Sequence, residues 1–213
     1  MPTRIKICGL RTAQDVAAAV ACGADDIGLV FFAKSPRHLT LDDAAALALT
    51  VPLGVRKVAL TVDATDAELD ALVARVPVDL LQLHGHETPA RVAEIRDRTG
   101  VPVMKAIGIA DAADLDQIDA YVAVCEEVLV DAKPPRHGDL PGGNGLSFDW
   151  RLLEGRRWSV PWMLAGGLRP SNVAEAIRLT GAPQVDVSSG VERRPGEKDA
   201  DMIRDFCAAV RGA

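Results

Sequence analysis

Short apolar runs alternate along the chain with stretches that suit amphipathic helices. The runs fall at residues 4–8, 26–31, 57–62, 80–83, 102–107, 127–131, 162–165 and 184–188, and the helical pattern is weakest after the fifth and sixth. Runs such as DIGLVFF are almost continuously hydrophobic, which is typical of parallel strands buried on both faces. Eight βα units with short connections predict a (β/α)8 barrel (a TIM barrel) as a single α/β domain over residues 1–213. A doubly wound open sheet is the alternative, and the number of units favours the barrel.

Several of the expected helices begin with residues that cap a first turn. Three pairs fit a capping box, in which two side chains bind free N–H groups of the first turn: Thr12 with Asp15, Thr40 with Asp43, and Thr65 with Glu68. Thr88 before Pro89 fits an N-cap followed by proline at the first helical position. The triplet Phe148-Asp149-Trp150 predicts a further helix start.

Composition narrows the classes of function. The 213 residues carry a net charge of −6 and no clustered stripe of Lys and Arg, which argues against a nucleic-acid partner. The opening MPTRIKICGL lacks a signal-peptide pattern and no run of about 18 apolar residues occurs, so we expect no membrane partner and a cytoplasmic location. The cysteines show no CxxC spacing and are expected to be free thiols rather than disulfides or a zinc site: Cys8, Cys22, Cys125 and Cys207.

Cys8 and Asp131 are the candidate catalytic groups, because both end a strand and barrel active sites lie at these ends. Strand alternation places Lys6 on the face of Cys8, where its ammonium would lower the thiol pKa. Lys133 shares the face of Asp131 and would favour its carboxylate. If Cys8 and Asp131 face one cavity, one can hold a proton that the other lacks, as an acid–base pair requires. The structural alternatives are a small buried hydrophobe at Cys8 and a salt-bridged carboxylate at Asp131.

Two glycine-containing loops are candidates for binding phosphate. Gly166 and Gly167 follow the seventh strand, and Ser188, Ser189 and Gly190 follow the eighth, where barrels often bind phosphate through backbone N–H groups.

Other polar residues at the strand ends suit an anionic or polar ligand. Arg37 in the second βα loop suits a carboxylate or phosphate, or else is a solvated loop arginine. His84 and His86 lack a further ligand cluster, so substrate contacts or surface positions are favoured over a metal site.

The motifs at the strand ends resemble one family along the chain from about residue 4 to residue 207. The motifs are KICGL, GLVFFAKSPR, LQLHG, VDAK…GGNGLSFDW, LAGGLRPSNV and VDVSSGVE…PGEKD, and they resemble phosphoribosylanthranilate isomerase of tryptophan biosynthesis. The resemblance implies an Amadori rearrangement of N-(5-phosphoribosyl)anthranilate to 1-(2-carboxyphenylamino)-1-deoxyribulose 5-phosphate, without cofactor or metal.

The resemblance also assigns roles to residues. It makes Cys8 the general base and Asp131 the general acid, and Arg37 the residue that holds the anthranilate carboxylate. Gln82, His84 and Asp186 are further expected substrate-binding residues. Phosphate is expected at Gly166, Gly167, Ser188, Ser189 and Gly190. The covering loop is expected at residues 134–146, with Asn144 in GGNG where the family usually has threonine.

Several alternatives stay open at this point. We expect a monomer, with a homodimer as the alternative. The Arg193-Arg194 pair is either surface charge or a steering feature for an anionic substrate. A related histidine-pathway isomerase, a dual-substrate enzyme and a non-catalytic phosphate-binding barrel are the competing functions; Cys8 argues against the first two, and Cys8 with Asp131 against the third.

Overall fold

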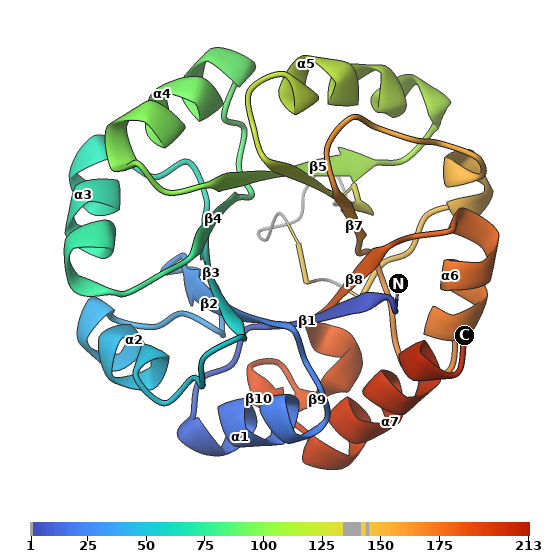
Figure 1. Ribbon diagram of the computed structural model, residues 1–213, viewed down its shortest axis with the longest axis horizontal. Helices are drawn as coiled ribbons and strands as arrows, with labels where there is room; N and C mark the ends of the chain where they lie inside the picture. The colour runs from blue at the N-terminus through green and yellow to red at the C-terminus, as the bar shows by residue number, and fades with distance from the viewer. Residues whose placement is uncertain (1, 134–141, 144) are drawn as a thin grey trace.

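Eight parallel strands close into a barrel, which confirms the predicted fold class. The computed structural model describes residues 2–133, 142–143 and 145–213, so Asn144 and most of the expected covering loop lie outside the described residues. The strands follow one another around the barrel in chain order, and β8 pairs with β1 (Figure 1). Their bounds lie within two residues of the predicted ones: β1 (Arg4–Cys8), β2 (Asp26–Phe31), β3 (Arg56–Thr61), β4 (Leu80–Leu83), β5 (Val103–Ile109), β6 (Glu127–Ala132), β7 (Trp162–Leu164) and β8 (Gln184–Val187).

A ring of helices surrounds the strands (Figure 1). The α-helices are α1 (Ala13–Ala21), α2 (Leu41–Ala48), α3 (Asp66–Arg75), α4 (Pro89–Thr99), α5 (Ile118–Val122), α6 (Val173–Thr180) and α7 (Ala200–Arg211). The weak fifth stretch forms the 3-10 helix η1 (Ala112–Gln117) followed by the short α5. The helix start at residues 148–150 yields only the 3-10 helix η2 (Trp150–Leu153), capped by Asp149. Gly155 follows at a φ of 69°, a left-handed conformation that ends helical structure at low strain.

The expected caps form, with one difference in detail. Thr65 and Glu68 make a complete capping box, and Thr88 caps a helix that starts with Pro89. Thr12 and Thr40 each accept a hydrogen bond from the backbone of the acid three residues later. Asp43 instead accepts from the Thr40 hydroxyl, and aspartate is one carbon shorter than the glutamate that completes the box at Thr65. These two sites are therefore single caps rather than capping boxes.

A short hairpin precedes the last helix and was not predicted. The 3-10 helix η3 (Ser189–Val191) leads into the antiparallel pair β9 (Glu192–Arg194) and β10 (Glu197–Lys198). Gly196 makes the turn at a φ of 81°, and a Cβ there would lie 2.5 Å from the carbonyl oxygen of Pro36. The hairpin thus packs tightly against the loop that follows β2.

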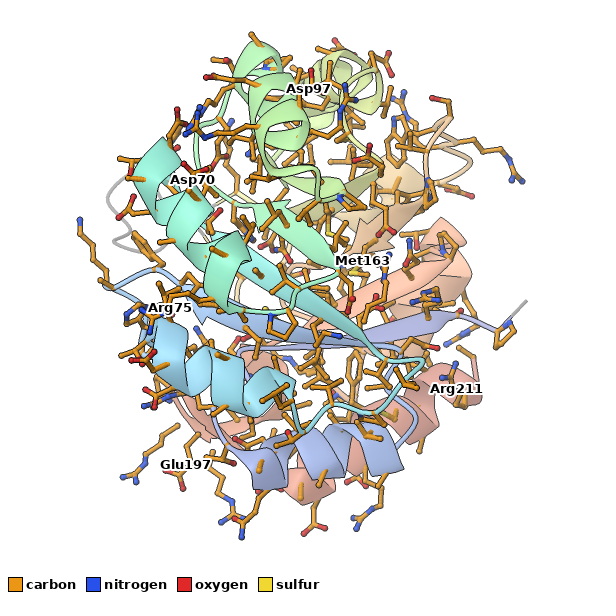
Figure 2. All side chains as sticks on the ribbon, turned by 60° about the vertical axis from the view of Figure 1, so that its left-hand side comes forward. Asp70, Arg75, Asp97, Met163, Glu197 and Arg211 are labelled. Carbon is orange, nitrogen blue, oxygen red and sulfur yellow. The ribbon has the colours of Figure 1, made fainter. Side chains whose placement is uncertain are left out.

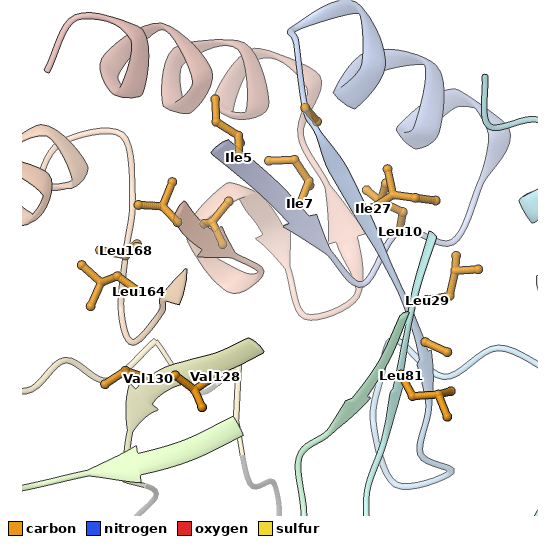
Figure 3. Packing of buried hydrophobic residues seen from close by; sticks show 14 of the residues in the cluster. Ile5, Ile7, Leu10, Ile27, Leu29, Leu81, Val128, Val130, Leu164 and Leu168 are labelled. Carbon is orange, nitrogen blue, oxygen red and sulfur yellow. The ribbon is translucent and has the colours of Figure 1, made fainter. Parts of the chain in front are cut away.

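The apolar core has two parts, one on each side of the barrel wall. Strand residues such as Ile5, Ile7 and Val130 pack outward against the helices (Figure 3). Inside the barrel lies a smaller cluster: Val58, Leu80, Met104, Ala106, Leu129, Met163 and Ala165. Figure 2 shows Met163 among the strands, whereas Asp70 and Asp97 lie on the outer helices. Among the described helices, none is long and apolar enough to span a membrane.

The amino ends of the strands carry a cluster of charged side chains, here called the lower ion cluster. Arg4, Asp26, Arg56 and Glu127 are the first residues of β1, β2, β3 and β6. Arg56 donates hydrogen bonds to both Asp26 and Glu127, and Arg4 donates to Asp26 at 2.7 Å. The Asp26 side chain is fully buried, so these arginines supply the opposite charge that burial of a carboxylate requires. This end of the barrel therefore serves stability and leaves the carboxyl ends for chemistry.

Candidate active site

The carboxyl ends of the strands form a pocket that contains most of the predicted site residues. It spans about 470 Å³, part of which is open to solvent, and its lining includes Cys8, Arg37, His84, Asp131, Asp186 and Ser188. An adjoining pocket of about 420 Å³ is lined by Gly166, Gly167, Ser188, Ser189 and Gly190, together with Asp131 and Asp186. Gln82 lines neither pocket and lies buried beside His84. The sequence-predicted residues are thus gathered at one end of the barrel.

Cys8 is buried at the end of β1, where the thiol meets opposing influences. Burial is the largest and raises the pKa of Cys8, whereas the Lys6 and Lys198 ammonium groups lower it and Asp186 raises it. Lys6 therefore lowers the thiol pKa as expected, but the net change in that pKa is upward. Desolvation of the sulfur outweighs the attraction of the ammonium groups. The resting residue is therefore a protonated thiol.

Lys6 and Asp186 form a buried ion pair beside that thiol. The Lys6 Nζ lies 2.8 Å from Asp186 Oδ1, and the Lys6 side chain is completely buried. Burial opposes the charge of Lys6, yet Asp186 and Cys8 together raise the pKa of Lys6 above its ordinary value. Asp186 also lines both pockets, so the same carboxylate that pairs with Lys6 can contact a ligand.

The Asp131 carboxylate contacts the His84 ring rather than a lysine. Its Oδ2 lies 3.3 Å from His84 Nε2, and its Oδ1 accepts a hydrogen bond of 2.7 Å from the backbone N–H of Ala132. The other ring nitrogen of His84, Nδ1, lies 2.9 Å from Gln82 Nε2. Gln82, His84 and Asp131 therefore form a chain of polar contacts from the barrel interior to the pocket.

Lys133 does not act on Asp131, which corrects the expectation from strand alternation. β6 ends at Ala132, and the half-exposed Lys133 side chain pairs with Asp114 of η1 at 2.6 Å. Side chains alternate between the two faces only while the backbone stays in a strand, and β6 ends one residue before Lys133.

The two glycine-containing loops approach each other closely at the second pocket. Gly166 and Gly167 both have positive φ, and a Cβ on Gly167 would lie 2.7 Å from the carbonyl oxygen of Leu146. A Cβ on Gly190 would lie only 1.9 Å from the carbonyl oxygen of Leu168. Glycine is required here because the backbones pass within a side chain's width of each other. The pocket they line is small and polar, as a phosphate site requires.

Arg37 lies at the pocket but is already engaged by an acid that was not predicted. Its Nε and Nη2 donate to the two carboxylate oxygens of Glu192, both at 2.8 Å. Lys198 Nζ approaches the same carboxylate at 2.7 Å and also donates to the carbonyl oxygen of Ser188 at 3.0 Å. The alternative of a solvated loop arginine is wrong, since Arg37 is 5% exposed.

Glu192 and Lys198 are the two site residues that sequence reasoning missed. The signal was present, because both stand in the motif VDVSSGVE…PGEKD that carried the family resemblance. Their pairing became visible only when the hairpin folded them back toward Arg37. The neighbouring Arg193 and Arg194 instead pair with Asp199 and Glu197 at the exposed surface.

The two histidines of LHGH diverge. His84 faces Asp131 in the pocket, whereas the exposed His86 pairs with Asp63 through Nδ1 at 3.0 Å. They do not converge on a common point as two ligands of one metal would.

Comparisons with known proteins agree on one family. The family model for N-(5'phosphoribosyl)anthranilate (PRA) isomerase matches residues 5–209. The chain is similar to N-(5'-phosphoribosyl)anthranilate isomerase from Cereibacter sphaeroides, with 62% identity over 208 residues that cover 98% of both chains.

Solved structures give the same family. One, from Thermotoga maritima, is described as mutually generated monomers of a dimeric phosphoribosylanthranilate isomerase; it is 32% identical, with a TM-score of 0.84 over 99% of this chain and 100% of that chain. A phosphoribosyl anthranilate isomerase in complex with reduced 1-(o-carboxyphenylamino)-1-deoxyribulose 5-phosphate matches with the same identity, TM-score and coverage.

Proposed function

The chain belongs to the N-(5′-phosphoribosyl)anthranilate isomerase family, and we propose that its barrel-top pocket performs this isomerisation by general acid–base catalysis between Asp131 and Cys8. The activity is the aldose–ketose isomerisation of N-(5-phosphoribosyl)anthranilate to 1-(2-carboxyphenylamino)-1-deoxyribulose 5-phosphate, in tryptophan biosynthesis. The observation that carries the mechanism is that Cys8 of β1 and Asp131 of β6 line one pocket although β7 and β8 separate their strands.

Two proton transfers open the sugar ring and move the carbonyl group. Asp131 protonates the ring oxygen, the C1–O bond breaks and a Schiff base forms between C1 and the anthranilate nitrogen. The Cys8 thiolate then removes the proton from C2. The electron pair of that C–H bond forms the C1–C2 double bond of an enolamine, while the π electrons of the C1–N double bond move onto the anthranilate nitrogen. Tautomerisation to the ketone completes the reaction. A donor and an acceptor on different sides of the sugar suffice.

Asp131 and Cys8 must share one proton for these steps. At rest, burial raises the pKa of Cys8 and so favours the proton on its sulfur. The active form has the same number of protons, with the proton on Asp131 and the sulfur as thiolate. Lys6 and Lys198 lower the energy of that thiolate and so support the exchange.

The remaining site residues match the two anionic ends of the substrate. The loops of Gly166, Gly167, Ser188, Ser189 and Gly190 offer backbone N–H groups to the phosphate. Arg37 faces the pocket of Cys8 and is proposed to hold the anthranilate carboxylate. His84 and Asp186 are proposed to contact the sugar between these ends, with Gln82 behind His84.

The proposal extends to assembly and location. We propose a monomer, with the homodimer as the alternative; the related Thermotoga maritima structure is described as monomers generated from a dimeric enzyme. All four cysteines are free thiols, which supports a reducing cytoplasm as the location.

Replacement of each catalytic group tests the mechanism. Cys8→Ser and Asp131→Asn should each lower kcat by about 10²- to 10⁴-fold, the usual contribution of a positioned acid or base. Product affinity should change little, because each variant keeps the size of its side chain. Loss of substrate fluorescence measures turnover, and calorimetric titration measures product affinity.

Cys207→Ser is the matched control and should leave kcat unchanged, because Cys207 is a buried thiol of α7 that does not line the pocket. Wild-type turnover in Asp131→Asn would eliminate the proposed acid. Wild-type turnover in Cys8→Ser would eliminate the proposed base.

A further inference from the structure

Arg37, Glu192 and Lys198 form a buried ionic group, here called the carboxylate clamp. Their side chains are 6%, 3% and 1% exposed. Glu192 sits between the two cations and receives hydrogen bonds from both, and the N–H of Gly196 donates to the same carboxylate at 3.2 Å. Three charged groups that are desolvated and mutually bonded have little freedom to move.

Glu192 fixes which edge of the guanidinium remains for a ligand. Its carboxylate accepts hydrogen bonds from Nε and Nη2, and Nη2 also lies 3.4 Å from the carbonyl oxygen of Gly143. Among the residues that the structure describes, Nη1 has no hydrogen-bond partner. A carboxylate ligand would therefore meet Arg37 at the Nη1 edge.

Packing confines the Arg37 side chain from two further sides. A Cβ on Gly9 would lie 2.4 Å from Arg37 Cδ, so the chain after β1 touches the arginine stem. The turn of the hairpin at Gly196 also packs against the backbone of Pro36, the residue before Arg37. The hairpin thus carries Glu192 and Lys198 to Arg37 and holds the loop of Arg37 in place.

Lys198 decides the net charge of the carboxylate clamp. Glu192 alone would neutralise Arg37, and a neutral pair attracts a carboxylate weakly. With Lys198 the clamp carries one excess positive charge in a buried setting, where Coulomb attraction is strong. Burial lowers the pKa of Lys198 below its ordinary value, and the adjacent Glu192 offsets part of that shift and so favours the charged ammonium.

The carboxylate clamp is also joined to the rest of the site. Lys198 donates to the carbonyl oxygen of Ser188 in the predicted phosphate loop, and the Ser188 hydroxyl donates to the carbonyl oxygen of Cys8 at 3.1 Å. These hydrogen bonds therefore connect the residues that are expected to bind the substrate carboxylate, to bind its phosphate and to act on its C2 carbon.

We propose that Glu192 and Lys198 are positioning residues for the substrate carboxylate: Glu192 sets the orientation of the Arg37 guanidinium, and Lys198 keeps the clamp positively charged. This inference rests on the proposed function, because it assumes that Arg37 meets the anthranilate carboxylate.

Glu192→Gln tests the proposal with two substrates. The variant keeps the side-chain shape but removes the charge that orients Arg37. The readout is the ratio of kcat/KM for N-(5-phosphoribosyl)anthranilate to kcat/KM for N-(5-phosphoribosyl)aniline, which lacks the carboxylate. We expect the ratio to fall at least about tenfold, the scale of a lost charged hydrogen bond, mainly through KM for the carboxylated substrate. A general loss of structure would lower both kcat/KM values together and leave the ratio unchanged, which would overturn the proposal.

A second variant covers a failure of Glu192→Gln to fold. The double variant Glu192→Gln/Lys198→Met has the same net charge of +1 as the wild-type clamp but lacks the carboxylate that orients Arg37. It should also show a reduced ratio of the two kcat/KM values. Glu197→Gln is the matched control, since Glu197 lies on the same hairpin and pairs with Arg194 at the surface. It should keep the wild-type ratio.

Arg37→Met separates this proposal from the proposed function. If Arg37→Met loses the preference for the carboxylated substrate and both Glu192 variants retain it, Arg37 keeps its role and the positioning by Glu192 is refuted. If Arg37→Met retains the preference, the carboxylate does not bind at Arg37 and the substrate orientation itself is wrong.

Discussion

Arg56→Met should destabilise the barrel strongly without touching the active site. Arg56 donates hydrogen bonds to Asp26 at 2.8 and 2.8 Å, and to Glu127 at 2.5 and 3.2 Å. Methionine fills a similar volume but leaves both carboxylates without this cation. Removing one partner of a buried ion pair costs about 3–5 kcal/mol.

The structure sets the expected value at the lower end of that range. Asp26 keeps its bond from Arg4, and the Arg56 side chain is 29% exposed, so some water reaches the cluster. We therefore expect a loss of about 3 kcal/mol, which corresponds to roughly 6–12 °C in Tm for a chain of this size.

Calorimetry and urea unfolding measure this loss. Arg98→Met is the matched control: Arg98 also contacts two acids, Asp66 and Asp70, but on the exposed surface, where ion pairs contribute little to stability. An equal loss in the two variants would refute the reasoning.

Two further predictions concern the site. Because Asp131 and Cys8 are proposed to share one proton, wild-type kcat/KM should stay level with pH while the pair holds that proton. Its alkaline fall should lie above 9.0, because burial raises the pKa of Cys8 above that ordinary value. The residual activity of Asp131→Asn should instead rise about tenfold per pH unit, as the thiolate fraction does below the thiol pKa. Parallel pH profiles for the two proteins, measured under single-turnover conditions, would contradict the shared proton. Gly190→Ala should raise KM in a steady-state assay at least about tenfold, because its Cβ would lie 1.9 Å from the Leu168 carbonyl oxygen and displace the loop proposed to bind phosphate. Gly212→Ala is the control, because the nearest atom to its Cβ would lie at 3.5 Å, and it should have the wild-type KM.

The barrel was predictable because local pattern and global fold agree. Buried runs such as residues 26–31 admit only a strand, and capping residues such as Thr65 and Thr88 mark where the helices begin. The weak stretch after β6 was also informative, since its described residues form the short 3-10 helix η2, which ends just before Gly155.

The electrostatics of the site were less predictable. Sequence alternation placed Lys6 beside Cys8 correctly, but the direction of the thiol pKa depends on burial, which a single strand does not reveal. Lys133 lies one residue beyond the strand, and Glu192 reaches Arg37 only through a hairpin turn, at a separation of 155 residues. Such pairings follow from tertiary geometry, not from spacing along the chain.

The closure of the barrel by β1 and β8 has a consequence for the order in which the enzyme gains activity during synthesis. The Lys6–Asp186 and Cys8–Ser188 contacts each join residues 180 positions apart. Domains form as the chain leaves the ribosome, and contacts of long sequence separation form late. A nascent chain that already contains Cys8, Arg37 and Asp131 therefore remains inactive until the segment with β8 and the hairpin has emerged, and every translation product truncated before that segment is catalytically silent.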